Sequence, residues 1–445
     1  MNLNNVKSIL FLGIGGIGMS ALAKYFMHKG VKVYGYDRAS SEMTDTLTQM
    51  GAIISFTDDE KLTTNAYDII VFTPAMPQDS LLLNYYQQGD KPLMKRSQAL
   101  GLITENSFTI AVSGSHGKTT VSSMITFLLK ECGVDCSAFL GGVSVNFNSN
   151  YVQGNSGVVV VEADEFDRSF MTLSPNIVVL TSMDTDHLDI YGTRENIVSS
   201  FLEFLNKLDE KGVLILNEKV VDEINVRGKK KIYGFHHGDY RATSLEIYPS
   251  HSIFSVNESS EVFKLNYNGR HNIENALAAI SVGLTMGITL EKMVNALDKF
   301  SGIKRRFEVI FQNEKCIYID DYSHHPTEIE SLVSSVKEIF PGKRVLSIFQ
   351  PHLYSRTRDL CLDFARSLDL SDEVLLLPLY PARELPIEGV TSYIVSHKMK
   401  TNVKVVDKAD LIAAINECNF DVILTIGAGD ISGCISDIKN YLSTR

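Results

Sequence analysis

Gly114-Ser115-His116-Gly117-Lys118-Thr119-Thr120 follows an apolar run at residues 109–112 and precedes a helical stretch at residues 121–130. In a strand, loop and helix of this kind the backbone amides cradle phosphate groups, the lysine neutralises their charge, and the first threonine hydroxyl binds Mg²⁺. The strict P-loop pattern has one more glycine, at the position that Val112 occupies here, so this loop is a shortened form. We therefore predict phosphate binding at this loop, in preference to an accidental turn.

The rest of the chain alternates short apolar runs with longer amphipathic stretches, which is typical of parallel sheets with crossover helices. We expect strands at residues 8–12, 31–36, 69–72, 109–112, 158–161, 177–180, 344–349, 373–377 and 422–426. Four more runs follow one another without a helix, and they predict antiparallel strands appended to a parallel sheet at residues 231–235, 244–248, 252–256 and 262–265. The predicted fold class is α/β.

The length of the chain predicts more than one domain, because 445 residues exceed what one core of typical size holds. A helical stretch ends in polar residues at 104–107, and another gives way to a strand at 301–304. We predict three domains, at residues 1–105, 106–302 and 303–445.

Composition and charge limit the function. Hydrophobic residues make up 44% and charged residues 21% of the chain, as in a soluble globular protein. The net charge of −11 argues against nonspecific binding of nucleic acids and anionic membranes, which depends on Lys and Arg. The chain has no apolar run near the roughly 20 residues of a membrane span, no signal-peptide pattern and no zinc-ligand spacing among its six cysteines. We expect a cytoplasmic enzyme with no nucleic-acid or membrane partner.

Another glycine-rich loop, Gly13-Ile14-Gly15-Gly16-Ile17-Gly18, lies between a predicted strand and a helical pattern at residues 19–28. We call it the first glycine loop because it precedes residues 114–120 in the chain, which form the second. Its glycines allow a tight turn and a close approach of the backbone to a diphosphate. Asp37 ends the next strand, where a ribose-binding acid is expected. The pattern does not separate NAD from other nucleoside diphosphates, and a glycine-rich packing turn is the alternative.

Acidic residues follow two neighbouring strands. The apolar run at 158–161 leads into Glu162-Ala163-Asp164-Glu165, and the run at 177–180 leads to Asp184-Thr185-Asp186-His187-Leu188-Asp189. The carboxyl ends of parallel strands are where ligands bind, so these groups could hold a metal ion beside the phosphate loop. For the two aspartates 184 and 186, helix capping or turn formation is about as good an explanation.

Later motifs place further polar side chains at strand and helix ends. Gly269-Arg270-His271-Asn272-Ile273-Glu274-Asn275 opens a helix whose amides could contact an adenine edge, with an N-cap and a solvated face as the alternative. Lys304-Arg305-Arg306 could reach phosphates, and a solvated basic turn explains it equally well. The last third carries polar clusters after apolar runs at residues 320–328, 350–358, 380–384 and 427–430.

In this order, the motifs resemble those of the Mur ligase family of peptidoglycan synthesis, over essentially the whole chain. The stretches that carry the resemblance are GIGGIGMSALA from Gly13, GSHGKTT from Gly114, EADEFDRSF from Glu162, DTDHLD from Asp184, GRHNIENALAA from Gly269, GIKRRFE from Gly302, DDYSHHPTEI from Asp320, FQPHLYSRTRDL from Phe349 and YPARELPIEGV from Tyr380. The shortened phosphate loop is also the form found in this family.

The resemblance implies a Rossmann-like domain for a UDP substrate, a central ATPase domain and a Rossmann-like C-terminal domain. It implies an ATP-dependent ligase that joins L-alanine to the lactyl carboxylate of UDP-N-acetylmuramate through an acyl phosphate, releasing ADP and phosphate. Two Mg²⁺ ions are expected, for which Mn²⁺ may substitute, and the protein is expected to be a monomer or a homodimer.

The resemblance also assigns residues to roles. Lys118, Glu162, His187, His352 and Arg356 would be catalytic, and Thr119, Glu162 and His187 would bind the metal. Nucleotide contacts would come from Gly114, Ser115, His116, Gly117, Lys118, Thr119, Thr120, His271, Asn272, Asn275, Arg306 and Asp321. Contacts to the other substrates would come from Gly13, Gly15, Gly16, Ile17, Gly18, Asp37, Thr73, Arg96, Tyr322, His324, His325 and Arg383.

Two departures from the family pattern limit this assignment. Many members have an Arg where this chain has Leu353, so Arg356 or Arg358 is expected to supply part of that contact. Other ligases of the family carry a carbamylated lysine shortly after the acidic histidine motif, whereas residues 194–206 contain no Lys, which favours an alanine-adding member.

Three alternatives remain open at this point. A recycling ligase that attaches a preformed tripeptide to the same sugar belongs to the same class, although the motifs at 349–360 and 380–390 favour alanine addition. An NAD-dependent oxidoreductase would use the first glycine loop but would leave Lys118 unexplained. An ATP-driven switch or binding module would have no need of the C-terminal His and Arg clusters.

Overall fold

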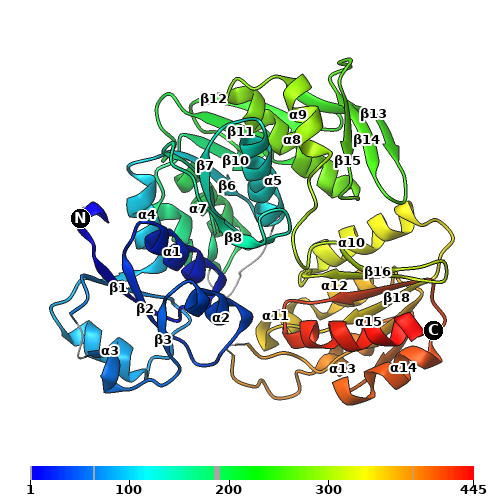
Figure 1. Ribbon diagram of the computed structural model, residues 1–445. Coiled ribbons are helices and arrows are strands. Elements are labelled where there is room, and N and C mark those ends of the chain that lie inside the picture. The colour runs from blue at the N-terminus through cyan, green and yellow to red at the C-terminus, as the bar shows by residue number, and fades with distance from the viewer. Residues whose placement is uncertain (1–2, 64–65, 185–190, 383, 445) are drawn as a thin grey trace. The chain divides into compact units, whose positions relative to one another are not determined.

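The structure is a computed structural model that describes residues 3–63, 66–184, 191–382 and 384–444 (Figure 1). Within these ranges the strands form three sheets. The chain divides into two compact units, the first made of Met1–Ser244, Phe254–Phe263 and Glu274–Phe300, the second of Leu245–Ile253, Lys264–Ile273 and Ser301–Arg445. The α/β fold class is confirmed, while the boundaries at 105 and 302 stay a prediction.

The first sheet has five parallel strands in the order β3-β2-β1-β4-β5. Its strands are β1 Ser8–Leu12, β2 Lys32–Tyr36, β3 Ile53–Ser55, β4 Ile69–Phe72 and β5 Leu93–Lys95, and its helices are α1 Ile17–His28, α2 Glu42–Gln49, α3 Leu81–Gln88 and α4 Arg96–Thr104. The strand order reverses between β1 and β4, so a crevice opens where these two strands end. Residues 13–18 and Thr73 follow these strand ends.

The central sheet has ten strands in the order β15-β14-β13-β12-β11-β10-β6-β9-β7-β8. Its strands are β6 Phe108–Ser113, β7 Cys136–Ser144, β8 Ser149–Val152, β9 Val158–Glu162, β10 Ile177–Leu180, β11 Val213–Asn217, β12 Lys229–Gly234, β13 Tyr240–Ile247, β14 Ser252–Val256 and β15 Val262–Leu265. The helices of this part are α5 Lys118–Glu131, α7 Arg194–Leu205, α8 Arg270–Thr285 and α9 Leu290–Leu297. Because β6 pairs in parallel with β9 on one side and with β10 on the other, the phosphate loop, Glu162 and Asp184 follow or end three adjacent strands.

The predicted block of antiparallel strands is only partly correct. β13, β14 and β15 are neighbours joined by connections of a few residues, which are too short for parallel crossovers. The first run was wrongly placed in this block, because β12 pairs in parallel with β11 and, over two residues, with β13. The lysines at 229–231 lie in β12, which continues the parallel sheet next to β11. The sequence did not show this direction, because no helix separates β12 from the strands that follow it.

The C-terminal sheet has six strands in the order β16-β17-β21-β18-β19-β20. Its strands are β16 Glu308–Gln312, β17 Ile317–Asp321, β18 Val345–Phe349, β19 Glu373–Leu376, β20 Asn402–Val405 and β21 Val422–Ile426, and its helices are α10 Pro326–Ile339, α11 Tyr354–Asp359, α12 Cys361–Leu368, α13 Ser392–Ser396, α14 Leu411–Glu417 and α15 Ile435–Thr444. Only the edge strand β16 runs antiparallel to its neighbour. The polar motifs at 350–358, 380–384 and 427–430 therefore follow the ends of β18, β19 and β21. The motif at 320–328 begins at the end of β17.

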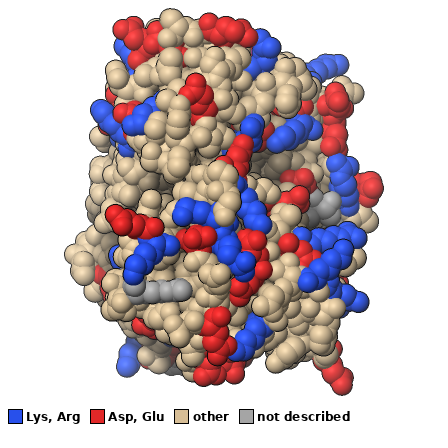
Figure 2. Space-filling model, turned by 90° about the vertical axis from the view of Figure 1, so that its right-hand side faces the viewer, with Lys and Arg blue, Asp and Glu red and all other residues tan. Residues whose placement is uncertain are grey.

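Buried apolar strands supply most of the core, as continuous parallel strands should. On the face shown in Figure 2, acidic and basic side chains are interspersed. Among the helices that the structure describes, none is long and apolar enough to cross a membrane.

Candidate active site

The phosphate loop joins β6 to α5 and lies against the segment that follows β10. Gly114 has a φ of +131°, a conformation that favours glycine, and a Cβ there would lie 2.1 Å from Thr181 Oγ1. The N–H groups of Ser115 and His116 donate to Ser182, to its carbonyl at 3.2 Å and to its hydroxyl at 3.0 Å. The neighbouring strand end thus fixes the shape of the loop.

The first turn of α5 completes the loop. The helix begins at Lys118 after Gly117, whose φ is +79°, and Thr119 and Thr120 are buried in its first turn. The first N–H groups of a helix lack intrahelical partners and carry partial positive charge, which suits a phosphate. The seven residues predicted to bind phosphate therefore share one loop, and their role stays a prediction.

Lys118 makes a buried ion pair with Glu165, a residue that the sequence patterns did not single out. Its Nζ lies 2.8 Å from Oε2 and 2.9 Å from Oε1 of Glu165, and the two side chains are 12% and 4% exposed. Burial alone would lower the pKa of Lys118, but Glu165 and its acidic neighbours outweigh this effect and raise it. Burial raises the pKa of Glu165 to about 7, against the opposing effect of Lys118.

Glu162 lies beside the start of the phosphate loop, because β9 pairs with β6 in a register that matches it with Val112. Its Oε2 accepts a hydrogen bond of 3.0 Å from the Gly141 N–H, and a Cβ at Gly141 would lie 2.3 Å from that oxygen. The Thr119 hydroxyl and this carboxylate are oxygen donors of the type that Mg²⁺ binds, so both fit the predicted metal site. The third predicted ligand, His187, lies outside the described residues, and the described part of the chain has no group of three His, Cys, Asp or Glu residues placed to hold a metal ion.

The first glycine loop is shaped by contacts on both sides. Gly13 has a φ of +84°, and a Cβ there would lie 2.5 Å from Thr73 Cγ2. The Gly15 N–H donates to Asp37 Oδ2 at 2.7 Å. Asp37, predicted to contact the substrate, therefore uses one carboxylate oxygen to hold the loop.

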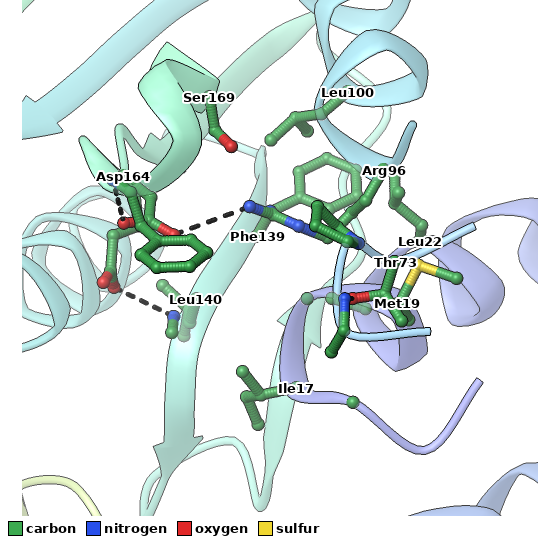
Figure 3. A pocket seen from close by; sticks show the side chains of 18 residues that line it. Ile17, Met19, Leu22, Thr73, Arg96, Leu100, Phe139, Leu140, Asp164 and Ser169 are labelled. Atoms are coloured by element: carbon green, nitrogen blue, oxygen red, sulfur yellow. Dashed lines mark hydrogen bonds and ion pairs between the residues drawn. The ribbon is translucent and has the colours of Figure 1, made fainter. Parts of the chain in front are cut away.

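A cavity of about 290 Å³ lies next to this loop, within the first unit (Figure 3). It is lined by five predicted substrate residues, one predicted metal ligand and apolar side chains, among them Gly16, Ile17, Gly18, Thr73, Arg96, Glu162, Leu22, Leu100 and Phe139. Arg96 packs on Gly18, where a Cβ would lie 2.9 Å from its Cδ, and its guanidinium lies 3.6 Å from the Asp164 carboxylate. The cavity therefore connects the first glycine loop with the acidic end of β9.

Buried polar contacts tie α1 to β8. Lys24 Nζ donates to Asn150 Oδ1 at 2.7 Å and to Ser149 Oγ at 3.2 Å, and burial lowers the pKa of Lys24. Asn150 Nδ2 donates to the Ile17 carbonyl at 2.6 Å and to Ser20 Oγ at 2.9 Å. These contacts hold the first turn of α1 beside the glycine loop.

The three predicted adenine contacts on α8 have different surroundings. Asn275, in the first unit, lies against the phosphate loop, since its Oδ1 would be 2.9 Å from a Cβ at Gly117. Asn272 is buried and donates to the carbonyl four residues before it at 2.7 Å, as part of the helix start. His271 Nδ1 lies 3.2 Å from Ser335 Oγ, and burial is the main cause that lowers the pKa of His271.

Two arginines flank one tyrosine in the second unit. The Cζ atoms of Arg305 and Arg306 lie 5.2 and 5.1 Å from the centre of the Tyr322 ring. The neighbouring Asp321 carboxylate accepts two backbone hydrogen bonds, at 2.6 and 2.7 Å. Asp321, predicted as a nucleotide contact, is thus also a tie that holds this turn.

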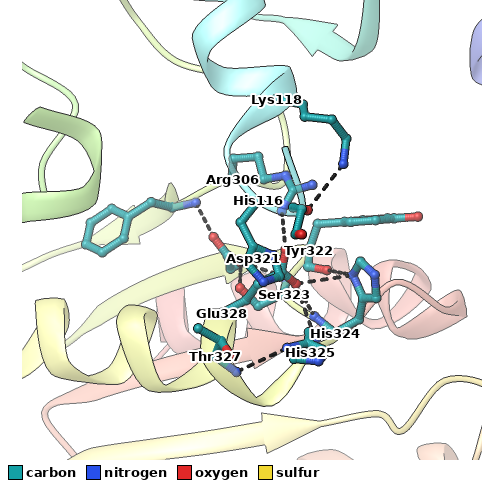
Figure 4. Close-up of polar contacts among 12 residues, drawn as sticks. His116, Lys118, Arg306, Asp321, Tyr322, Ser323, His324, His325, Thr327 and Glu328 are labelled. Atoms are coloured by element: carbon teal, nitrogen blue, oxygen red, sulfur yellow. Dashed lines mark hydrogen bonds and ion pairs between the residues drawn. The ribbon is translucent and has the colours of Figure 1, made fainter. Parts of the chain in front are cut away.

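The histidines of the C-terminal motifs are held by their own loops (Figure 4). The N–H of His324 donates to Glu328 Oε2 at 2.9 Å, and His325 caps α10. The ring of His352 stacks on Tyr380, with centroids 5.8 Å apart, and lies 6.2 Å from the His324 ring. The ends of β18 and β19 and the turn after β17 therefore bring these side chains together.

The two arginines expected to replace a missing one at Leu353 both lie on α11. Leu353 is buried, has a φ of +71° and immediately precedes α11, which carries Arg356 and Arg358. Arg358 pairs with Asp359 at 2.7 Å. Arg383 lies outside the described residues.

The shortened loop, its lysine and the first turn of α5 have the form of a phosphate loop, in a chain whose described strands form three sheets. Comparison with known protein families gives a match for each of three consecutive parts of the chain. The description "Mur ligase family, catalytic domain" matches residues 8–107, "Mur ligase middle domain" matches residues 112–283, and "Mur ligase, glutamate ligase domain" matches residues 305–429.

Relatives of full length support the same assignment. A protein of Cytophaga hutchinsonii and one of Flavobacterium johnsoniae, both named UDP-N-acetylmuramate--L-alanine ligase, are 43% and 44% identical and cover 100% of this chain and 99% of their own. A UDP-N-acetylmuramate-alanine ligase of Thermotoga maritima has a structure with a TM-score of 0.82 at 28% identity, covering 99% of this chain and 100% of its own. This chain belongs to the Mur ligase family.

Proposed function

We propose that this chain joins L-alanine to the lactyl carboxylate of UDP-N-acetylmuramate, using ATP, in the synthesis of peptidoglycan precursors. The observation that carries the proposal is the likeness, over the whole chain and above 40% identity, to proteins named for this reaction. Membership of the family also implies ATP as the source of energy. No observation of this kind favours an NAD-dependent oxidoreductase.

The first glycine loop and the cavity next to it would bind the sugar nucleotide. The N-terminus of α1, whose first N–H groups lack intrahelical partners, suits a diphosphate, and Arg96 at the cavity wall adds a cation. The apolar lining beside Arg96 suits the sugar and its lactyl group. In this arrangement the lactyl carboxylate would extend toward the end of β9, where Glu162 lies.

The second glycine loop would bind ATP through residues 114–120, with Lys118 at the β- and γ-phosphates and Asn275 beside the loop. Thr119 and Glu162 would hold Mg²⁺, which offsets the charge of the phosphates when it is bound. His187 completes this proposed set by resemblance.

The reaction would proceed in two steps. A lactyl carboxylate oxygen bonds to the γ-phosphorus while the bond to the β,γ-bridging oxygen breaks, which yields an acyl phosphate and ADP. The amine of L-alanine then attacks the acyl carbon, the C–O bond to phosphate breaks, and the amine loses a proton. Positive charge from Lys118 stabilises the first transition state by lowering repulsion between the two anions.

The C-terminal sheet would supply the contacts to L-alanine and to the acyl phosphate. The proposed residues that follow the described strand ends are Tyr322, His324, His325, His352 and Arg356, and Arg383 is added by resemblance. Arg306 and Asp321 would contact the nucleotide. The clustering of His324, His352 and Tyr380 supports this part of the proposal.

The proposal is tested by measuring phosphate release from ATP with purified protein. Release should require both UDP-N-acetylmuramate and L-alanine, and Gly, L-serine and the tripeptide should be poorer acceptors. Equal ATP turnover without the sugar nucleotide would contradict the proposal. Faster release with the tripeptide than with L-alanine would assign the chain to the recycling ligases.

A further inference from the structure

The ion pair between Lys118 and Glu165 is not used in the two steps above. Glu165 is three residues beyond Glu162, and its carboxylate is almost completely removed from solvent. A buried carboxylate is costly unless it is paired, so a role in the loop is a reasonable explanation of its presence.

All three N–H donors of the Lys118 ammonium are occupied. They are directed to the Gly114 carbonyl at 2.6 Å, the Ser115 carbonyl at 3.2 Å and the Glu165 carboxylate at 2.8–2.9 Å. A phosphate oxygen can therefore reach this ammonium only by replacing one of the three acceptors.

The Glu165 carboxylate is the acceptor that a phosphate replaces most readily. The two carbonyls belong to the loop that surrounds the phosphates, whereas the carboxylate carries a charge that repels them. The backbone of Glu165 is anchored, because its carbonyl accepts hydrogen bonds from the Tyr191 hydroxyl at 2.6 Å and from the Arg168 N–H at 2.9 Å. An exchange would consequently be a movement of side chains and would leave the segment in place.

The turn that follows Glu165 is stabilised by contacts outside the phosphate loop. Asp167 and Arg168 both have φ values near +50°, a left-handed conformation that is costly for these residues. It is maintained by an ion pair of 2.7 Å from Lys95 to Asp167 and by a second pair from Arg168 to Glu203. The distance of the Glu165 backbone from the phosphate loop is therefore fixed by contacts outside the loop.

We propose that Glu165 is a positioning residue for Lys118, which holds the ammonium at the loop until a phosphate oxygen of ATP takes its place. The proposal rests on the proposed use of ATP by this chain, and it adds a role for Glu165 at the ATP site. It predicts that the carboxylate and the nucleotide compete for the same ammonium.

The test is the affinity for a non-hydrolysable ATP analogue with Mg²⁺, measured by calorimetry without the other substrates. Glu165→Gln keeps the size and an acceptor oxygen but removes the charge, so the analogue should bind about five- to tenfold more tightly, because a charged hydrogen bond is stronger than a neutral one. kcat should not rise with the affinity, since the carboxylate is already replaced in the nucleotide complex, whereas simple loss of structure would weaken binding.

A double-mutant cycle separates this exchange from a general change of charge. In the background Lys118→Met, Glu165→Gln should tighten binding much less, because only the direct repulsion between the carboxylate and the phosphates is then removed. Asp164→Asn is the matched control, since it removes the neighbouring charge, which pairs with Arg96 instead of Lys118. It should tighten binding less than Glu165→Gln does.

The proposal fails if Glu165→Gln weakens binding of the analogue or leaves it unchanged, or if it tightens binding equally without Lys118. Should Glu165→Gln not fold, Glu165→Asp serves instead, since its shorter side chain loosens the same contact and should also tighten binding. A wild-type protein that binds the analogue but does not ligate L-alanine would refute the proposed function alone, because the exchange needs only the nucleotide.

Discussion

Two helices of the first unit begin at a glycine loop, and each buries a lysine. Lys24 of α1 has only neutral partners, an amide and a hydroxyl, and burial lowers its pKa. Lys118 of α5 faces the carboxylate of Glu165, and its pKa is raised. The two loops thus share one arrangement of strand, loop and helix, but Lys24 only stabilises the packing of its helix, whereas Lys118 contacts the carbonyl groups of its own loop.

This difference indicates how the two loops can bind phosphates in different ways. The first loop leads into the N-terminus of α1, and the cation packed on its Gly18, Arg96, comes from another helix, α4. The second loop carries its own cation at the first position of its helix. A loop that only binds a diphosphate needs no internal cation, whereas a loop where a phosphoryl group is transferred must stabilise developing charge.

The largest effect is expected for the lysine of the second loop. Lys118→Ala should lower ligation by about 10³-fold or more, since it removes the charge aimed at the transferred phosphoryl group. Turnover is measured by phosphate release, and the melting temperature should show that the variant still folds. Lys130→Ala is the control on the same helix, because Lys130 pairs with Asp135 near the surface, and its turnover should be close to normal. Near-normal turnover of Lys118→Ala would show that the phosphate-loop assignment is wrong.

The glycines of the two loops should affect different substrates. At Gly114 a Cβ meets backbone atoms of Ser182 at 2.8 and 3.0 Å, so Gly114→Ala should raise KM for ATP by about five- to 150-fold, if the strain is about 1–3 kcal/mol. A Cβ at Gly13 meets side chains, Thr73 Cγ2 at 2.5 Å and Met76 Sδ at 3.8 Å, so Gly13→Ala should raise KM for the sugar nucleotide by less. Steady-state kinetics with each substrate varied would test this pairing.

The matched controls are glycines at the far ends of the same helices. Gly30 and Gly133 also have positive φ values, of +77° and +89°, but nothing lies within 4 Å of a Cβ at either position. Their alanine variants should lose about 1 kcal/mol of stability without a change in either KM. If Gly13→Ala and Gly114→Ala raised KM for the same substrate, the two loops would not have separate ligands.

A smaller effect is expected at the polar tie of α1. Asn150→Ala removes the hydrogen bonds to Ile17 and Ser20 and leaves Lys24 with one hydroxyl partner, which should lower the free energy of unfolding by about 2 kcal/mol. KM for the sugar nucleotide should rise several-fold, while KM for ATP should stay unchanged. Denaturant unfolding and steady-state kinetics check both parts. An equal rise in both KM values would contradict a local role.

The smallest effect is a pH dependence at Lys24. Because burial lowers the pKa of Lys24, the unfolded chain holds this proton more strongly than the folded protein, so stability should rise with pH through the interval below the ordinary value of 10.5. Lys24→Met should lack this contribution, and the difference between the two unfolding free energies should change in favour of the wild type as the pH is raised toward 10.5. A difference that stays constant would mean that the ammonium is well solvated.

The sequence predicted the strand ends well, because apolar runs and glycines are local features. The strands at 8–12, 69–72, 177–180 and 422–426 have the predicted bounds, and both loops lie between the expected strand and helix. β12 was misjudged because the direction of a strand depends on its partner, which a run of lysines and apolar residues does not reveal.

Within the site, the sequence identified motifs better than it identified the partners of single side chains. Glu165 escaped notice because its contact with Lys118 depends on the turn at 166–168, whose left-handed residues have no sequence pattern of their own. Asp37 and Asn272 were predicted to contact ligands, and the structure shows that they also hold backbone groups. A polar residue at a strand or helix end can do either, and only its neighbours in space distinguish the two.

The pairing of Lys118 with Glu165 also bears on which anions the loop admits. An ammonium already neutralised by a carboxylate adds little net attraction for a passing phosphate or sulfate ion. A nucleoside triphosphate would make many contacts along the loop and the first turn of α5, which would offset the loss of the ion pair, whereas a small anion would make too few. The loop would thereby discriminate by the size of its ligand and remain available to ATP in a solution rich in phosphate.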